Sequence, residues 1–288
     1  MASVRGGVLP TPPSPKSLLR QHGLRAKKHF GQNFLAQADL ATRIATLATE
    51  PIGGTVVEIG AGLGALTAPL LERARRVVAI ERDRDLIPAL QACFATSVAA
   101  GNLILLEEDA KQVDYARWLA GPSPRCIAGN LPYQITGPLL ERVTHLRNHV
   151  ARAVFLVQLE VAHRLVALPA TPEYGALSVF IQSQYAVRRA FVVRRGAFYP
   201  QPKVDSAVVV LDPLTTPVSI ETPTFRAVVR DAFSQRRKTL RNSWRNLLGL
   251  PSATIEQAAD RAAISLEVRG EVLAPADFAR MAAEVDAC

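Results

Sequence analysis

Short runs of β-branched and apolar residues alternate with amphipathic segments through the first half of the chain. The apolar runs predict buried strands at 55–60, 76–81, 103–107, 125–130 and 152–158. Between them, apolar residues recur every three or four positions and predict helices at about 64–74, 84–95, 112–119 and 136–147. Strands and helices that alternate at this spacing form βαβ units. We therefore expect an α/β fold with a mostly parallel sheet covered by helices on both faces.

The pattern changes after the fifth predicted strand. Two strand-like stretches, near 181–194 and 203–211, follow each other across the turn at 196–202 without a helix between them, which predicts an antiparallel pair at one edge of the sheet. A linker rich in Pro and Thr follows Asp212. Beyond it, helical periods predict a small all-helical domain, with helices at about 223–234, 236–248, 254–263 and 275–286. We therefore expect a disordered, basic and Pro-rich tail at 1–15, an α/β domain at 16–212 and a helical domain at 213–288.

Composition narrows the class of protein. The 288 residues contain 34 Lys and Arg against 25 Asp and Glu, a net charge of +9, and 49% are hydrophobic. This apolar content excludes a wholly disordered chain, and the positive charge favours an anionic partner. The 3 cysteines are widely spaced, which gives no disulfide framework, and no apolar run is long enough to span a membrane. We expect a cytoplasmic protein; an organelle transit peptide is the alternative, because no acid precedes Asp39.

A glycine-rich segment, EIGAGLG at 58–64, joins the first predicted strand to the next helix. Gly60 and Gly62 allow a tight turn and let the backbone approach a ligand, although a βα turn without a ligand would show the same residues. The next strand ends in Glu81, 21 residues after Gly60, about the spacing at which a carboxylate binds ribose hydroxyls. Asp109 follows the third strand, where it could accept from an adenine amine. The sequence therefore predicts a nucleotide site.

The fourth strand ends in Asn130-Leu131-Pro132-Tyr133. An exocyclic adenine amine is a poor nucleophile because its lone pair is delocalised into the ring. Methylation of that amine therefore calls for acceptors of both N–H groups, which the Asn130 side chain and the Leu131 carbonyl can supply. Pro132 lacks an N–H and leaves the strand ladder, and Tyr133 can stack on the base. An ordinary turn also fits Asn-x-Pro, but its place at the end of a strand in a nucleotide-binding sheet favours the amine site.

The chain resembles the family of small-subunit ribosomal RNA adenine dimethyltransferases, which dimethylate N6 of two adjacent adenosines near the 3′ end of that RNA. The resemblance covers about residues 16–288. Its motifs are HFGQNFL at 29–35, VVEIGAGLGALT at 56–67, Glu81, EDA at 108–110, GNLPYQIT at 129–136, FLVQLEVAHRL at 155–165, FYPQPKVDSAVV at 198–209 and FSQRRKTLRNSW at 233–244. The resemblance implies a Rossmann-like class I methyltransferase domain, with S-adenosylmethionine as the methyl donor and no metal.

Carried over residue by residue, the resemblance implies two sets of site residues. The expected cofactor contacts are Asn33, Leu35, Gly60, Gly62, Glu81, Asp109 and Asn130. The expected catalytic residues are Asn130, Leu131, Pro132, Tyr133 and Phe198, with the two aromatic rings enclosing the target base. FYPQP at 198–202 also fits a turn stiffened by proline. The chain departs from the family pattern at Gln134, where Asn is expected, and at Glu108, where Gly is expected.

Basic residues predict contacts with RNA phosphates. The helical domain carries Arg236, Arg237, Lys238, Arg241 and Arg245, of which three recur every four residues along the helix expected at 236–248. Further cations lie around the expected edge strand, namely Arg188, Arg189, Arg194 and Arg195. A solvated helix face is the plain alternative. The partner implied by the resemblance is small-subunit rRNA in a 30S particle or its precursor, bound by a monomer without a membrane. His145 and His149 lack a third ligand, so we expect no metal site.

Three other functions remain open. A large-subunit adenine methyltransferase of macrolide resistance shares the fold and a similar Asn-x-Pro-Tyr site, but FYPQPKVDS and FSQRRKTLRN favour the small-subunit family. A DNA adenine methyltransferase usually carries Asp or Asn followed by Pro-Pro-Tyr. A binding protein, such as a mitochondrial transcription factor or a ribosome-assembly factor, could keep this fold without catalysis. The presence of both Asn130 and Glu81 favours the enzyme.

Overall fold

Seven strands form one sheet in the order β4-β3-β2-β5-β6-β9-β7, and a two-stranded sheet pairs β1 with β8. The computed structural model describes residues 14–50, 52–235 and 237–288, so most of the tail expected at 1–15 lies outside the described residues. The strands are β1 Phe34–Leu35, β2 Thr55–Ile59, β3 Arg76–Glu81, β4 Leu103–Glu107, β5 Arg125–Asn130, β6 Arg152–Gln158, β7 Tyr185–Val193, β8 Phe198–Tyr199 and β9 Ser206–Pro213.

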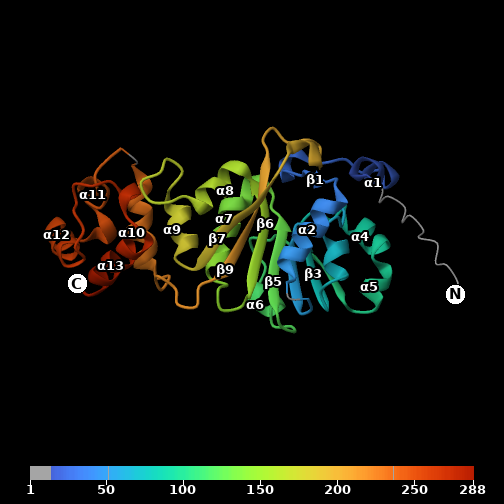
Figure 1. The fold of residues 1–288 in the computed structure, drawn as a ribbon, viewed down its shortest axis with the longest axis horizontal. Coiled ribbons are helices and arrows are strands. Elements are labelled where there is room, and N and C mark those ends of the chain that lie inside the picture. The colour runs from blue at the N-terminus through green and yellow to red at the C-terminus, as the bar shows by residue number, and fades with distance from the viewer. Residues whose placement is uncertain (1–13, 51, 236) are drawn as a thin grey trace, which may run out of the picture.

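Helices cover both faces of the large sheet, and a helical region lies beyond one end of it (Figure 1). The helices are α1 Pro15–Gln21, α2 Ala38–Ala48, α3 Thr67–Leu71, α4 Ile87–Cys93, α5 Ala95–Ala99, α6 Tyr115–Trp118, α7 Thr136–Thr144, α8 Leu159–Val166, α9 Ala176–Gln182, α10 Pro223–Ser234, α11 Leu240–Ser243, α12 Ser252–Arg261 and α13 Pro275–Asp286. The first of them begins at Pro15, where the Ser14 hydroxyl caps it by accepting from the Ser17 N–H.

The sheet is mixed, which confirms the predicted fold class. Strands β2 to β6 are parallel, whereas β9 runs antiparallel to both β6 and β7. The edge strand is therefore β7, and β9 is inserted between it and the parallel strands. Successive side chains point to opposite faces, so Val57 and Val78 lie in one buried cluster while Val56 and Val77 lie in the other. Because both faces are buried, these strands read as continuous apolar runs.

The parallel strands end at one edge of the sheet. In register, Ile59 lies opposite Ile80 on one side and Gly129 on the other. The residues that follow these positions are Gly60, Glu81 and Asn130. Strands β2, β3 and β5 therefore bring residues from three distant parts of the chain together at their carboxyl ends, where ligands of open α/β sheets bind.

The C-terminal helices have their own buried cluster, centred on Trp244, which donates its indole N–H to the Val228 carbonyl at 2.9 Å. Four buried members of this cluster precede the boundary expected at 213, namely Ala167, Tyr174, Val179 and Phe180. The helical core therefore extends back to α9, which packs against both the sheet and α10.

Two sequence expectations differ from the structure. The helix expected at 236–248 is only α11, which ends at Ser243; a separate 3₁₀ turn at Leu247–Gly249 follows it, and in that turn Leu248 takes a positive φ of 53° that no continuous α-helix includes. The stripe with a period of four residues therefore does not lie on one helix. The strand expected at 181–194 begins at Tyr185, since the preceding apolar residues belong to α9.

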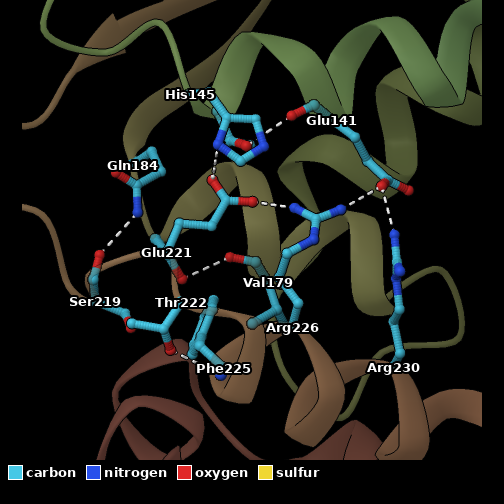
Figure 2. A network of polar contacts seen from close by, with 12 residues as sticks. Glu141, His145, Val179, Gln184, Ser219, Glu221, Thr222, Phe225, Arg226 and Arg230 are labelled. Carbon is cyan, nitrogen blue, oxygen red and sulfur yellow. Dashed lines mark hydrogen bonds and ion pairs between the residues drawn. The ribbon is translucent and has the colours of Figure 1, made fainter.

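An ionic network joins the helical region to α7 (Figure 2). The guanidinium of Arg226, on α10, bridges Glu221 in the linker and Glu141 on α7, the latter at 2.5 Å. Arg230 also donates to Glu141, at 2.9 Å, and His145 Nδ1 lies 3.6 Å from Glu221 Oε2. Breaking a buried ion pair leaves an uncompensated charge, so this network stabilises the arrangement of the two parts.

The two arginines of this network differ in exposure, which gives a matched comparison. The Arg226 side chain is 18% exposed and that of Arg230 is 56% exposed. We expect Arg226→Ala to lower the free energy of unfolding by roughly 3–5 kcal/mol, because it leaves Glu221 buried without its partner. Arg230→Ala should cost less than about 1 kcal/mol, as exposed pairs do. Urea unfolding followed by circular dichroism measures both; equal small losses would contradict this role of Arg226.

Candidate active site

A cavity opens at the carboxyl ends of β2 to β5. The segment 29–34 forms its opposite wall, together with the loop at 130–135. Its lining residues are His29, Phe30, Gly31, Gln32, Asn33, Phe34, Ile59, Gly60, Gly62, Ile80, Glu81, Arg82, Glu108, Asp109, Ala110, Asn130, Leu131, Pro132, Tyr133, Gln134 and Ile135. The wall is mostly apolar with a few polar groups, as is typical of small-molecule sites.

The glycine-rich loop after β2 lies at the floor of this cavity. Gly60 has a φ of +77° and Gly62 a φ of +58°, a region that side chains with a Cβ rarely adopt. A Cβ at Gly62 would lie 3.1 Å from the Phe34 ring, so glycine also lets the segment 29–34 approach the loop closely. The glycines therefore shape a backbone cradle open to a ligand.

Glu81, at the end of β3, holds this loop to the neighbouring strand. Its Oε2 accepts from the Gly62 N–H and its Oε1 from the Asp83 N–H, both at 2.8 Å. The side chain is only 8% exposed, and burial raises the pKa of this carboxyl above its usual range. Each carboxylate oxygen has a second lone pair, so Glu81 can still accept from two ligand hydroxyls.

A second carboxyl lies in the core beneath the loop. Glu58 is 1% exposed and accepts from the Thr67 hydroxyl at 2.6 Å. Burial raises the pKa of Glu58 to about 7. Glu58 is not among the residues that line the cavity, so we assign it to holding the start of α3 rather than to ligand binding.

Asn130 ends β5 and lines the cavity opposite Glu81. Its Nδ2 donates to the Asn33 carbonyl at 2.8 Å, across 97 residues of sequence. Because an amide has one donor end and one acceptor end, this bond leaves Oδ1 as the end available to a ligand. The geometry therefore presents a hydrogen-bond acceptor to the cavity.

The residues after Asn130 complete this wall. Leu131 donates its N–H to the Leu156 carbonyl at 3.0 Å, and the Pro132 carbonyl accepts from Thr136 Oγ1 at 3.0 Å. The Tyr133 hydroxyl shares a hydrogen bond of 2.8 Å with Ser206, and burial raises the pKa of the Tyr133 phenol. Tyr133 therefore presents a neutral ring, fixed in place, in the cavity wall just after the end of β5.

The structure does not bring every expected residue to the cavity. Asn33, Gly60, Gly62, Glu81, Asp109, Asn130, Leu131, Pro132 and Tyr133 line it, whereas Leu35 and Phe198 do not. These two residues pair with each other through β1 and β8, and Phe198 is 4% exposed within a buried cluster. Both residues that depart from the family pattern, Gln134 and Glu108, line the cavity.

Asp109 lies on the rim, held by its neighbours. Its Oδ1 accepts from the Lys111 N–H at 2.9 Å, and its Oδ2 lies 3.3 Å from Arg82 Nη1. The carboxylate is thus fixed by a backbone donor and a partly exposed cation. It can accept a further hydrogen bond from a ligand in the cavity.

Sequence reasoning missed a cluster beside the cavity. Asp83, with a side chain 2% exposed, accepts from Lys27 at 2.5 Å and from Gln32 at 2.8 Å. The burial of Asp83 arises from tertiary contacts, so the segment ERDRD at 81–85 gives no local signal of its partners.

Some of the basic residues expected to contact RNA phosphates form ion pairs with carboxylates of the protein, and others do not. Arg241 is held by two carboxylates, Glu256 at 2.5 Å and Glu267 at 2.8 Å. Arg237, Lys238 and Arg245 have no ion pair in the part of the chain that the structure describes, and Arg236 lies outside the described residues. Near the cavity, Arg194 pairs with Asp205 at 2.7 Å, while the side chains of Arg195 and Lys203 have no such partner among the described residues.

None of the described helices is both long enough and apolar enough to cross a membrane. Within residues 14–50, 52–235 and 237–288, no group of three or more His, Cys, Asp or Glu side chains is arranged to hold a metal ion.

Comparisons with known proteins agree on one family. The model of the family described as "Ribosomal RNA adenine dimethylase" matches residues 23–287. A ribosomal RNA small subunit methyltransferase A from Magnetococcus marinus is 44% identical over 275 residues, covering 93% of this chain and 94% of that protein. The protein of the same name from Anaeromyxobacter sp. strain K is 42% identical over 280 residues, covering 93% of this chain and 96% of that protein.

Two solved structures share the fold. A dimethyladenosine transferase from Plasmodium falciparum matches with a TM-score of 0.72 and 25% identity, covering 86% of this chain and 95% of that one. The 23S rRNA methyltransferase ErmE matches with a TM-score of 0.63 and 26% identity, covering 88% of this chain and 100% of that one.

Proposed function

The chain belongs to the ribosomal RNA adenine dimethylase family, and we propose that its cavity holds S-adenosylmethionine and the target adenine side by side at the carboxyl ends of β2 to β5. It is an S-adenosylmethionine-dependent rRNA adenine dimethyltransferase. The observation that carries the site assignment is Asn130, whose amide presents its oxygen to the cavity that Glu81 also lines.

The residues of the cavity fit the cofactor. The turn at Gly60 and Gly62, where both φ angles are positive, lines the cavity, and Glu81 retains lone pairs for the two ribose hydroxyls. We assign Asp109 to the adenine amine of the cofactor, and the segment from Asn33 to Leu35 to the methionine end. S-adenosylmethionine supplies a methyl group that is already strongly electrophilic, so the protein needs alignment and acceptors more than a general base.

The target amine is oriented by the end of β5. Asn130 Oδ1 and the Leu131 carbonyl accept its two N–H groups, which turns the nitrogen lone pair out of conjugation with the ring. After one transfer the charged nitrogen releases a proton to solvent and keeps one N–H. Either acceptor can hold that N–H while a second methyl group is transferred, after which the last proton is also released to solvent.

Aromatic rings hold the base, which must leave its stack to reach the cavity. Tyr133 lines the cavity and provides one face. We also propose Phe198 for the other face. Because Phe198 belongs to β8 and is buried in the core, this assignment requires the segment around β8 to shift when the base enters.

The substrate is rRNA of the small subunit. Relatives of that name match at 40–44% identity over more than nine tenths of the chain, whereas ErmE, named for 23S rRNA, matches at 26%. We propose that the modified nucleotides are two adjacent adenosines in a loop near the 3′ end, in a 30S particle or its precursor, and that the enzyme acts as a monomer in the cytoplasm.

Methyl transfer from labelled S-adenosylmethionine tests this function. Undermethylated small subunits, naked small-subunit RNA and large-subunit RNA are compared in parallel. We expect label in the small-subunit samples alone. Label in large-subunit RNA would place the protein with the resistance enzymes, and particle binding without any label would favour an assembly factor.

The protein offers two basic surfaces to RNA phosphates. The first lies in the helical domain and consists of Arg236, Arg237, Lys238, Arg241 and Arg245. The second lies beside the cavity. This surface is the exposed groove lined by Arg194, Arg195, Gly196, Gln201, Lys203 and Asp205. Asp205 precedes Ser206, whose hydroxyl bonds to Tyr133, so the groove adjoins the base site. Unpaired cations there can neutralise phosphates next to the extruded nucleotide.

Salt dependence measures this contribution. We expect Arg195→Ala to weaken RNA binding and to reduce the slope of log affinity against log salt by about 0.7–0.9, the value for one phosphate contact. Arg75→Ala removes the same charge at the opposite edge of the sheet, where β3 begins, and should leave the slope unchanged. Equal slopes for both variants would show that the groove does not bind RNA.

A further inference from the structure

We propose that Asp83 is a positioning residue that joins the ribose-binding carboxylate of Glu81 to the amine-binding amide of Asn130. The proposal rests on the function assigned above to those two residues. Asp83 does not line the cavity, so it acts only through the groups that it holds.

Asp83 is linked to the cofactor-binding residue Glu81 through its backbone. The Asp83 N–H donates to Glu81 Oε1 at 2.8 Å, while Glu81 Oε2 is held by the Gly62 N–H. These two donors fix the plane of the Glu81 carboxylate. A change in the backbone at Asp83 therefore changes the direction in which Glu81 offers its remaining lone pairs.

Asp83 is linked to the N-terminal segment through its carboxylate, by an ion pair and a hydrogen bond. Asp83 Oδ1 accepts from Lys27 Nζ at 2.5 Å, and Asp83 Oδ2 accepts from Gln32 Nε2 at 2.8 Å. Gln32 Oε1 in turn accepts from the Lys27 N–H at 2.7 Å, which closes a ring of three residues. A carboxylate that is 2% exposed needs such donors to offset its lost hydration, so the ring fixes where Gln32 lies.

The ring reaches the amine site through the residue that follows Gln32. The Asn33 carbonyl accepts from Asn130 Nδ2 at 2.8 Å, and this bond decides which end of the Asn130 amide faces the cavity. If Asn33 moved away, the amide could turn and present a donor, which would repel the N–H groups of the target. Asp83 thus controls, from outside the cavity, the orientation of the acceptor.

Asp85 provides a matched control. It accepts from the same Lys27 Nζ, at 2.6 Å, but its side chain is 48% exposed and it contacts neither Gln32 nor Glu81 through its carboxylate. Lys27 keeps its charge in either variant at neutral pH, because the carboxylate that remains still raises its pKa. Asp83→Asn and Asp85→Asn therefore each neutralise one carboxylate next to the same lysine. Only Asp83→Asn also disturbs the contact with Gln32.

The kinetic test compares these two variants with the wild type. We expect Asp83→Asn to lower kcat of methyl transfer by about 10- to 100-fold, the range for a misplaced reacting group, with KM for RNA within about twofold of the wild type. Asp85→Asn should retain kcat within about twofold. A wild-type kcat in Asp83→Asn, or equal losses in both variants, would overturn the proposal. A general loss of structure would instead lower RNA affinity together with kcat, and that result would overturn it as well.

A spectroscopic test does not depend on catalysis. In ¹⁵N-labelled protein, the side-chain amide signals of Asn130, assigned by their loss in Asn130→Ala, should shift in Asp83→Asn and stay in place in Asp85→Asn. Unshifted signals in Asp83→Asn would overturn the proposal that Asp83 positions the Asn130 amide. If the wild type transferred no methyl group, the proposed function would fail while this measurement still decided whether Asp83 orients Asn130.

Discussion

Replacing Asn130 with alanine is expected to reduce methyl transfer by roughly 100- to 1,000-fold, comparable to removing one polar group that stabilises a transition state. The variant loses the acceptor for one N–H of the target amine, so the nitrogen lone pair stays conjugated with the ring. RNA affinity should change little, because phosphate contacts dominate it. Single-turnover transfer to small subunits, with RNA binding measured alongside, gives both quantities.

Asn148→Ala serves as the control for this variant, because Asn148 is exposed in the turn after α7 and does not line the cavity. It should transfer at the wild-type rate. Near-normal transfer by Asn130→Ala would exclude the amide as the acceptor. A joint loss of transfer, RNA binding and circular dichroism signal would indicate misfolding, and Asn130→Asp, which keeps an acceptor oxygen, would then replace it.

Glu81→Gln is expected to weaken binding of S-adenosylmethionine and its demethylated product by about 100-fold. The amide keeps the size of the side chain but turns a donor toward either the Gly62 or the Asp83 N–H. It also removes a charge-assisted hydrogen bond to ribose, worth roughly 1.5–3 kcal/mol. Isothermal titration calorimetry with S-adenosylhomocysteine measures the loss directly.

The pH dependence of that affinity gives a second criterion. Burial raises the pKa of Glu81, so this group takes up a proton earlier than an ordinary glutamate as the pH falls. Affinity should therefore be full above the raised pKa and decline as the pH falls through it, whereas Glu81→Gln should show no such decline. Glu107→Gln, on the adjacent strand, is the control because Glu107 is exposed. Equal affinities for all three proteins would contradict the ribose assignment.

The sequence predicted the sheet well because its strands are buried on both faces. Runs such as RVVAIE at 76–81 and RAVFLVQ at 152–158 have no polar interruption at their centres, so their bounds agree with β3 and β6. The antiparallel edge was also correctly predicted, since no helix could fit between its two strands. The two-residue strands β1 and β8 escaped prediction because such short segments carry no periodicity.

The remaining differences come from tertiary contacts. The helix expected at 236–248 is shortened because Trp244 is drawn into the core and Leu248 takes a left-handed conformation. The ring of Lys27, Gln32 and Asp83 joins residues 51 and 56 positions apart, and nothing local in the sequence reveals such a contact. Phe198 lies under the cavity wall although its motif suggests a ligand contact, because β8 pairs with β1.

Nucleoside mass spectrometry of small-subunit RNA after reaction with the purified enzyme tests the central claim most directly. If Asn130 and Leu131 orient an adenine amine through two successive transfers, the RNA should gain N6,N6-dimethyladenosine, about two residues per RNA molecule, and Asn130→Ala should yield almost none. A product methylated on another atom or another base, or an unchanged yield from Asn130→Ala, would contradict the account.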